Sequence, residues 1–149
     1  MRIVLQRVTR ARVTVEGRIT GEIGAGLVAL IGVGREDTAA TAASMADKVA
    51  KLRVFNDAEG KMNLSLLDTA GALLAVSQFT LYGDARGQRR PSFVQAAPAE
   101  MSKSLYEEFV AHMKALGVRV ETGVFQAYMS VELVNDGPVT ILLDSDKTF

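Results

Sequence analysis

The residues best suited to carbonyl chemistry lie near the middle of the chain, where a polar segment follows an apolar run. Ser77, Gln78 and Thr80 come directly after Ala72–Val76, with Phe79 between them. The segment is either a strand that frays into a polar loop or a strand end that presents hydroxyl and amide groups to a substrate. Ser77 or Thr80 could serve as a nucleophile, but a hydroxyl is weak without an adjacent base.

Side chains that could supply such a base are scarce. The chain has no cysteine and a single histidine, His112. His112 lies one residue off an apolar helical stripe and lacks an evident hydrogen-bonding partner, so we expect a half-exposed surface residue. A Ser-His-Asp arrangement is therefore not expected. A hydrolase built on this chain would depend on backbone N–H donors at the strand end, a hydroxyl and a base borrowed from the substrate.

Metal and nucleotide sites find little support in the sequence. Asp144 and Asp146 have no His-Cys cluster or EF-hand spacing around them, and we interpret them as solvated carboxylates. Gly32 and Gly34 follow a predicted strand, but the third glycine of a dinucleotide fingerprint and a Walker lysine are missing, which favours a plain turn. We expect no metal and no cofactor.

Three arginines, Arg86, Arg89 and Arg90, follow the polar segment within five residues. Such a cluster is either a solvated basic loop or a contact for phosphate groups, which guanidinium forks bind well. Its position next to Ser77–Asp84 favours phosphate contact. We therefore assign these arginines to tRNA or other RNA binding as a hypothesis.

The composition of the chain is that of an ordinary globular domain. The 149 residues predict one domain over 1–149, and 17 basic residues balance 17 acidic ones, so any RNA contact must come from a local patch. The N-terminal segment lacks the apolar core of a signal peptide, and the longest apolar run, Leu27–Val33, is too short to span a bilayer. We expect a soluble cytoplasmic protein that makes no membrane contact.

Periodic apolar residues predict the elements that must position these side chains. The expected strands are an N-terminal pair over residues 3–8 and 13–15, followed by 27–33, 73–80, 118–122, 129–134 and 139–143, with short strands on either side of a turn at 56–60. Asn135-Asp136-Gly137-Pro138 is predicted to join the last two strands as a hairpin turn.

Two helices are predicted from apolar residues spaced three and four apart. Asp37 or Thr38 caps the first, and Pro98 opens the second, which Gly117 ends. Their inward faces are Ala42, Met45, Val49 and Leu52 in the first helix, and Met101, Leu105, Phe109, Met113 and Leu116 in the second. Many strands with two separate helices predict a single α+β domain with a curled antiparallel or mixed sheet, or a β-barrel.

Two separated motifs resemble those of one family. Ser77–Leu81 together with Asn135–Thr140 is similar to the D-aminoacyl-tRNA deacylases of the bacterial and eukaryotic type, and the likeness extends over essentially the whole chain. It also includes Arg2–Val8, Asp57–Asn63 and Arg90–Phe93, whereas Asp84–Arg89 departs most from the family pattern.

The resemblance implies a homodimer that hydrolyses the ester between a D-amino acid and the terminal adenosine of tRNA. It implies that Ser77, Gln78, Phe79 and Thr80 line the pocket, with Gln78, Phe79 and Thr80 at the chemical step, and that Met129 contacts the substrate. It leaves two candidates for the reactive group: Thr80 as nucleophile, or the ribose 2′-OH of the RNA. The shortage of side-chain bases favours the 2′-OH.

The resemblance further implies that Gly137-Pro138 carries a cis peptide and enters the pocket of the partner subunit. Only about 5–6% of X–Pro bonds are cis, so this is a specific expectation. Carbonyl groups aimed at the α-carbon of the substrate would exclude an L side chain and admit a D one. Glycine has no side chain to exclude, so glycyl-tRNA should also be cleaved. The alternatives from other classes are a non-catalytic tRNA- or RNA-binding module and a small-molecule esterase.

Overall fold

A six-stranded mixed sheet with a strong curl organises the computed structural model, which describes residues 1–149. Its strands are β1 (Arg2–Val15), β2 (Arg18–Ile23), β3 (Gly26–Gly32), β6 (Ala72–Ser77), β7 (Arg119–Thr122) and β8 (Ser130–Asp144). The order is β2-β1-β3-β6-β7, with β8 also paired to β1, and a separate two-stranded sheet holds β4 (Phe55–Asn56) and β5 (Met62–Leu64). The expected single α+β domain with a curled mixed sheet is confirmed.

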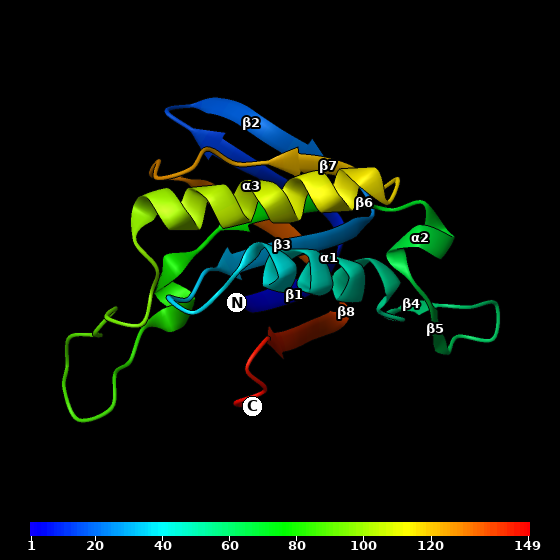
Figure 1. Ribbon diagram of the computed structural model, residues 1–149. Helices are drawn as coiled ribbons and strands as arrows, with labels where there is room; N and C mark the ends of the chain where they lie inside the picture. The colour runs from blue at the N-terminus through cyan, green and yellow to red at the C-terminus, as the bar shows by residue number, and fades with distance from the viewer.

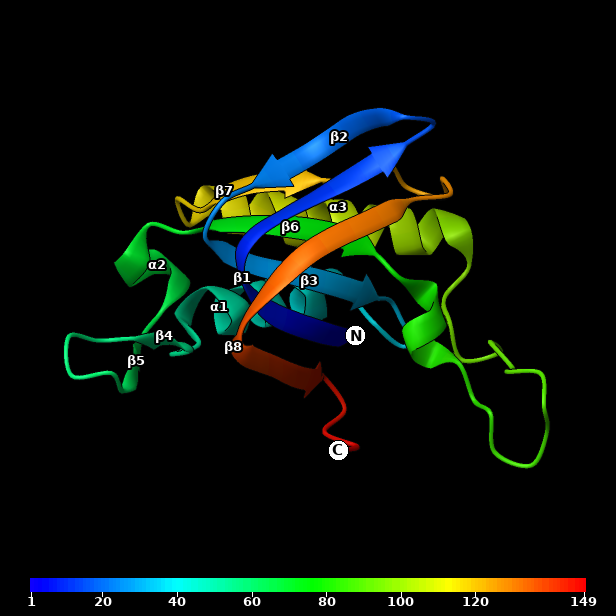
Figure 2. The same cartoon turned by 180° about the vertical axis from the view of Figure 1, so that it is seen from behind.

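The long strand β1 has three partners because it changes neighbour part-way along one edge. Its first half pairs antiparallel with β3 as far as Val8, opposite Gly26, and its second half pairs antiparallel with β2 from Ala11 onward. Along its other edge, β1 pairs with β8 over nearly its whole length. Figure 2 shows β1 and β8 bending together across the strands β3 and β6.

Two helices, α1 (Ala39–Lys51) and α3 (Ala99–Ala115), lie on the same face of the sheet (Figure 1). Thr38 caps α1 through a side-chain hydrogen bond with the backbone N–H of Thr41, as expected for one of the two candidate caps. A short helix α2 (Leu66–Thr69) and a 3₁₀ turn η1 (Phe79–Tyr82) complete the structure. No helix is long and apolar enough to cross a membrane.

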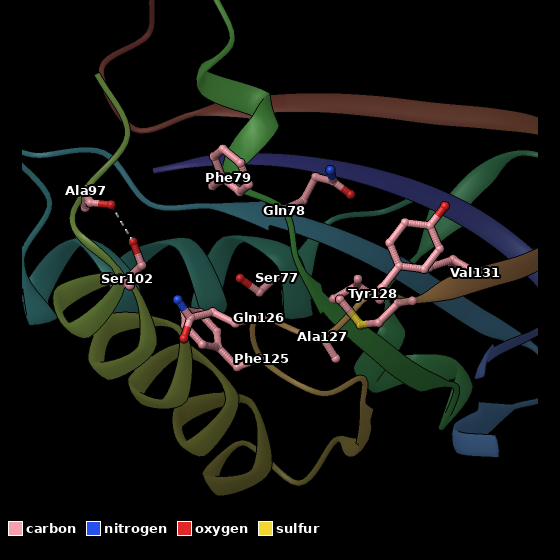
Figure 3. Close-up of a pocket in the computed structure, with 13 residues that line it drawn as sticks. Ser77, Gln78, Phe79, Ala97, Ser102, Phe125, Gln126, Ala127, Tyr128 and Val131 are labelled. Carbon is pink, nitrogen blue, oxygen red and sulfur yellow. Dashed lines mark hydrogen bonds between the residues drawn. The ribbon is translucent and has the colours of Figure 1, made fainter. Parts of the chain in front are cut away.

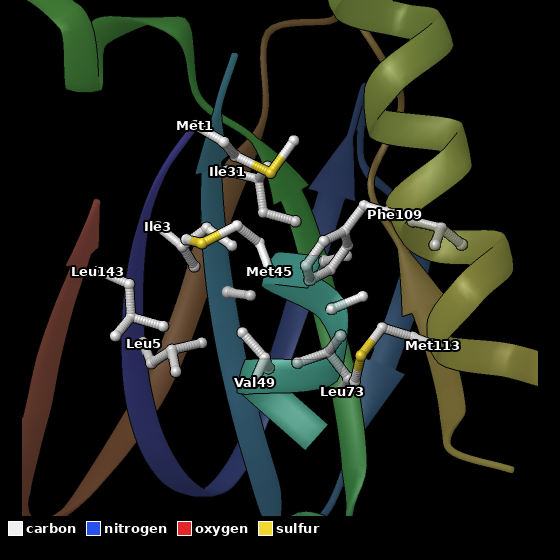
Figure 4. Packing of buried hydrophobic residues seen from close by; sticks show 14 of the residues in the cluster. Met1, Ile3, Leu5, Ile31, Met45, Val49, Leu73, Phe109, Met113 and Leu143 are labelled. Carbon is white, nitrogen blue, oxygen red and sulfur yellow. The ribbon is translucent and has the colours of Figure 1, made fainter. Parts of the chain in front are cut away.

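The apolar core has two layers, one on each face of the central strands. Between the helices and the sheet, Phe109 and Met113 of α3 meet Met45 and Val49 of α1 over Leu73 of β6 (Figure 4). The second layer lies inside the curl of the sheet and includes Val8, Val13, Val28, Leu74 and Val76. The strands β3 and β6 are thus buried on both faces, which explains their continuous apolar runs.

Several expected elements are confirmed with small changes of boundary. The predicted inward residues of both helices are buried or pack against the core, and Gly117 follows the end of α3 with φ +90°. The N-terminal segment, expected as a pair of strands, is one continuous strand, β1. The strand expected over residues 73–80 ends at Ser77, because the chain turns into η1 immediately afterwards.

The prediction of a hairpin at Asn135-Asp136-Gly137-Pro138 is wrong. Both flanking segments belong to β8 and pair antiparallel with the same strand, β1. Gln6 lies opposite Thr140 and Val8 lies opposite Asn135, so β8 carries extra residues at this point and forms a bulge. The segment does turn, as its residues indicate, but it forms a bulge that projects from one strand and does not reverse the chain between two strands. Within it, the Gly137-Pro138 peptide is cis, as expected.

Candidate active site

A pocket of about 560 Å³ with mainly apolar walls and a few polar groups opens where β6 ends. Three chain segments build it: the end of β6, the start of α3, and the segment that leads into β8 (Figure 3). The residues that line it are Val76, Ser77, Gln78, Phe79, Ala97, Ala99, Ser102, Phe125, Gln126, Ala127, Tyr128, Met129 and Val131. Of the predicted site residues, Ser77, Gln78, Phe79 and Met129 are therefore brought together.

The end of β6 is held in place by hydrogen bonds from two directions. The backbone N–H of Gln78 donates to the carbonyl of Ile31 over 2.7 Å, which continues the parallel pairing with β3. The buried hydroxyl of Tyr106 in α3 donates to the carbonyl of Ala75 over 2.9 Å, and burial raises the pKa of this phenol. Helix and strand are thereby fixed relative to each other two residues before Ser77.

The start of α3 forms the opposite wall. The backbone N–H of Ala97 donates to the carbonyl of Val33 at 2.9 Å, and the buried Ser102 hydroxyl donates back to the carbonyl of Ala97 at 3.0 Å (Figure 3). These bonds connect the end of β3 to the first turn of the helix. The wall is therefore rigid, and the Ser102 hydroxyl is already satisfied by the protein.

Thr80 lies beside the pocket rather than in its lining. It is exposed in η1, where its hydroxyl accepts a hydrogen bond from the side-chain amide of Gln78. Phe79 packs edge-on against Phe93 with ring centroids 5.0 Å apart, which connects the pocket to the following loop. The three side chains predicted at the chemical step thus share one corner of the site.

The arginine loop projects away from the body of the protein next to η1 (Figures 1 and 2). Its base is closed by two backbone hydrogen bonds of 2.8 Å between Asp84 and Ser92. Arg86 folds back onto the carboxylate of Asp84 at 2.7 Å, and this hydrogen bonding holds the pKa of Asp84 well below its usual range. Arg89 and Arg90 are exposed and make no ion pair with the protein.

Gly137 and Pro138 are exposed at the tip of the bulge in β8 and do not line the pocket of their own chain. Five residues lie between Val131, at the pocket, and Gly137, at the tip. One chain therefore presents a pocket at one place and the Gly137-Pro138 tip at another.

The tip is fixed by Arg7, a residue that the sequence analysis did not single out. The Arg7 side chain is only 8% exposed, and its guanidinium donates to the carbonyl of Asp136 at 3.2 Å and to that of Val54 at 2.8 Å. Asn135 adds a bond by accepting from the backbone N–H of Val139 at 3.0 Å. The sequence did contain a signal for this role: Arg7 continues the alternation of the inward residues Ile3 and Leu5, so its side chain should also point inward.

Two other candidates lie away from the pocket. His112 does have a partner, Asp47 of α1, with Nε2 and Oδ1 3.3 Å apart, and the histidine side chain is 31% exposed, as expected for a surface residue. Asp144 is not solvated, contrary to expectation. Burial raises the pKa of its carboxyl, but hydrogen bonds from Thr148 and from the backbone N–H of Asp146 outweigh burial and lower it.

Known proteins of the same size share this architecture and sequence. The family model described as D-Tyr-tRNA(Tyr) deacylase matches residues 4–144. The chain belongs to the D-Tyr-tRNA(Tyr) deacylase family. Proteins named D-aminoacyl-tRNA deacylase from Koribacter versatilis and Symbiobacterium thermophilum are 63% and 62% identical to it over 149 residues, which is all of this chain and 100% and 99% of theirs.

Solved structures share the fold of this chain. The structure titled "c-Myc DNA Unwinding Element Binding Protein" superposes with a TM-score of 0.91 at 40% identity, over 97% of this chain and 98% of that one. A probable eukaryotic D-amino acid tRNA deacylase superposes with a TM-score of 0.83 at 18% identity, over 95% and 97% of the two chains, which shows the shared fold.

In this deacylase-family chain, sequence reasoning missed one of the three pocket walls, the start of α3, and identified only Met129 in the segment that leads into β8. The segment from Phe125 to Tyr128 and the start of α3 carry no motif that chemistry would select. They reach the pocket only because α3 and β8 fold back against the end of β6.

Replacing Arg7 tests whether its guanidinium fixes the bulge. Arg7→Met should lower the free energy of unfolding by about 1–3 kcal/mol, because buried carbonyl acceptors such as that of Val54 lose their donor. Arg12→Met is the matched control, since Arg12 lies on the same strand and pairs with Glu132 in solvent. Urea unfolding monitored by circular dichroism measures both variants. Equal shifts of the unfolding midpoint would contradict the anchoring role.

Proposed function

We propose that the protein hydrolyses the ester between a D-amino acid and the terminal adenosine of tRNA, releasing the free amino acid and the tRNA. The observation that carries this proposal is full-length membership of the deacylase family at about 60% identity to its named members. The pocket at the end of β6 supports it, because Ser77, Gln78 and Phe79 line it and Thr80 lies beside it. We assign its action to the cytoplasm, because its substrate, aminoacyl-tRNA, is used there.

The composition of the pocket favours a base supplied by the substrate. Tyr128 is the only lining residue with an ionisable side chain, and no carboxylate, histidine or lysine lines the pocket. A phenol is a poor general base near neutral pH. The ribose 2′-OH beside the ester is therefore the group that we assign to the chemical step, with Thr80 and Gln78 positioning the substrate around it.

Oxyanion stabilisation comes from the turn that follows β6. The first N–H groups of a helical turn have no partner inside it, so those of Phe79 and Thr80 at the start of η1 are free to donate. Backbone donors fixed at a strand end stabilise a developing negative charge without reorganisation. The hydrogen bond between Gln78 and Thr80 holds the two sides of this turn together.

Chirality is read by the Gly137-Pro138 tip of a second copy of the chain. The tip is exposed, anchored by Arg7, and absent from the lining of its own chain's pocket, so it is placed to serve another chain. In a twofold dimer, each chain gives its tip to the other and receives one in return. The tip excludes an L side chain by contact and admits a D side chain or the hydrogen of glycine.

The arginine loop supplies contacts to the tRNA backbone. Arg89 and Arg90 are exposed and free of ion pairs within the chain, whereas Arg86 is engaged by Asp84. Guanidinium groups in this state bind phosphate oxygens readily. We therefore assign phosphate contact to Arg89 and Arg90 first. Arg86 could make the same contact once a phosphate replaces the carboxylate of Asp84 as its partner.

A deacylation assay separates this function from the two alternatives. The purified protein should release D-amino acids and glycine from tRNA, leave L-aminoacyl-tRNA intact, and work in the presence of a chelator. An RNA-binding module would bind tRNA without release, and a small-molecule esterase would cleave a free D-amino acid ester as fast as the tRNA ester. Activity lost with chelator and restored by zinc would contradict the proposed chemistry.

The identity of the reactive group is tested by changing the enzyme and the substrate separately. Thr80→Ala should keep activity within about tenfold of the wild type, because a positioning contact is worth about 1 kcal/mol. A D-aminoacyl-tRNA that ends in 2′-deoxyadenosine should be nearly inert. Single-turnover release measures both. A covalent acyl-enzyme trapped on Thr80 would instead identify Thr80 as the nucleophile.

Mixing two inactive variants tests whether the site is completed across a dimer. Gln78→Ala damages the pocket and Pro138→Ala damages the tip, so each variant alone should have low activity. After co-refolding at equal concentration, half of the dimers are mixed and each holds one intact site, which predicts recovery of about a quarter of the wild-type activity. No recovery, with mixed dimers shown by mass spectrometry, would place tip and pocket in one chain.

A further inference from the structure

Tyr128 is the most exposed of the large hydrophobic side chains, although it belongs to the lining of the pocket. It is 97% exposed, compared with 54% for Phe79 on the other side of the same pocket. Figure 3 shows Tyr128 near Gln78, on the segment that leads into β8. The ring pairs with no other aromatic side chain, and its hydroxyl has no hydrogen-bond partner in the chain.

The backbone around this ring is fixed. On one side, Gln126 adopts φ +62° and the N–H of Ala127 donates to the carbonyl of Val124 at 3.2 Å, which closes a turn. On the other side, Met129 packs against Gly123 so closely that a Cβ there would come within 2.5 Å of its sulfur. The exposed ring is therefore presented by a rigid support and is not the end of a loose loop.

We propose that the Tyr128 ring stacks on an unpaired base at the 3′ end of the tRNA. This inference rests on the proposed function, since it concerns the same substrate. No charged side chain lines the pocket, so the mouth has nothing to hold a phosphate. It offers the exposed aromatic face of Tyr128, and stacking on such a face accepts any base. Tyr128 is thus a positioning residue that lowers KM without taking part in the chemical step.

The kinetic test separates positioning from structure. Tyr128→Ala should raise KM for D-aminoacyl-tRNA about 5- to 150-fold and leave kcat within about twofold, because base stacking is lost and the reacting atoms are untouched. Tyr128→Phe and Tyr128→Trp should retain the wild-type KM, whereas Tyr128→Leu, which is bulky but not aromatic, should resemble Tyr128→Ala. The control is Phe149→Ala, which removes another exposed aromatic ring and should leave KM unchanged.

Three substrates identify the base that is stacked. The tRNA ester, the D-aminoacyl ester of adenosine and the D-aminoacyl ester of methyl riboside share the ribose 2′-OH, but the last has no base. If Tyr128→Ala raises KM for both the tRNA ester and the adenosine ester, the stacked base is the terminal adenine. If it raises KM for the tRNA ester alone, the stacked base is the next one along the tRNA. Either result supports the proposal. An equal rise in KM for the riboside ester, which has no base, overturns it.

Two further outcomes overturn the proposal while leaving the proposed function intact. One is a wild-type KM for Tyr128→Ala on the tRNA ester. The other is a KM change that follows weakened self-association in sedimentation, which would show that a second copy of the chain covers the ring. Wild-type protein is assayed alongside, and its inactivity on D-aminoacyl-tRNA would count against the proposed function itself.

Discussion

The structure depends on the fact that a strand has only two edges, while β1 needs three partners. β1 gives one edge to β8 and divides the other between β3 and β2, with the change of partner between Val8 and Ala11. At the same place, the β1–β8 ladder shifts register, because β8 places extra residues opposite Arg7. Bulges increase local twist and bend the strands around them. One irregularity therefore curls the sheet and projects Gly137-Pro138 from its surface.

The curl also determines where a pocket can form. It buries β3 and β6 on both faces, so these strands present polar groups only at their ends. The parallel strands β3 and β6 end at the same edge, and α3 begins there because Ala97 is bonded to Val33. Binding sites outside the carboxyl ends of parallel strands are a general property of such sheets. Ser77 and Gln78 are at the site because that is where β6 has to stop.

The sequence predicted the parts of this fold that depend on local periodicity. The helical stripes and the buried runs were recognised because each repeats over many residues, as in Met45 and Val49 or Leu73 and Leu74. The bulge was taken for a hairpin because residues such as Asn135-Asp136-Gly137 are typical of both hairpin turns and bulges. Only the pairing of β8 with β1 on both sides of this segment distinguishes the two. Tyr128 and Ser102 could not be assigned to the pocket, since nothing local indicates which distant segments converge.

The pairing of β1 with β8 also has a consequence for biosynthesis. Arg2 lies opposite Asp144, so β1 has one uncovered edge until β8 has been made. Segments far apart in sequence form contacts slowly, and during translation the N-terminal part of the chain emerges first. Both the anchored tip and the wall that Met129 and Val131 add to the pocket come from the final fifth of the chain. A nascent chain that extends only as far as β7 therefore has a sheet with an open edge at β1, and it lacks both the tip and the pocket wall that β8 supplies.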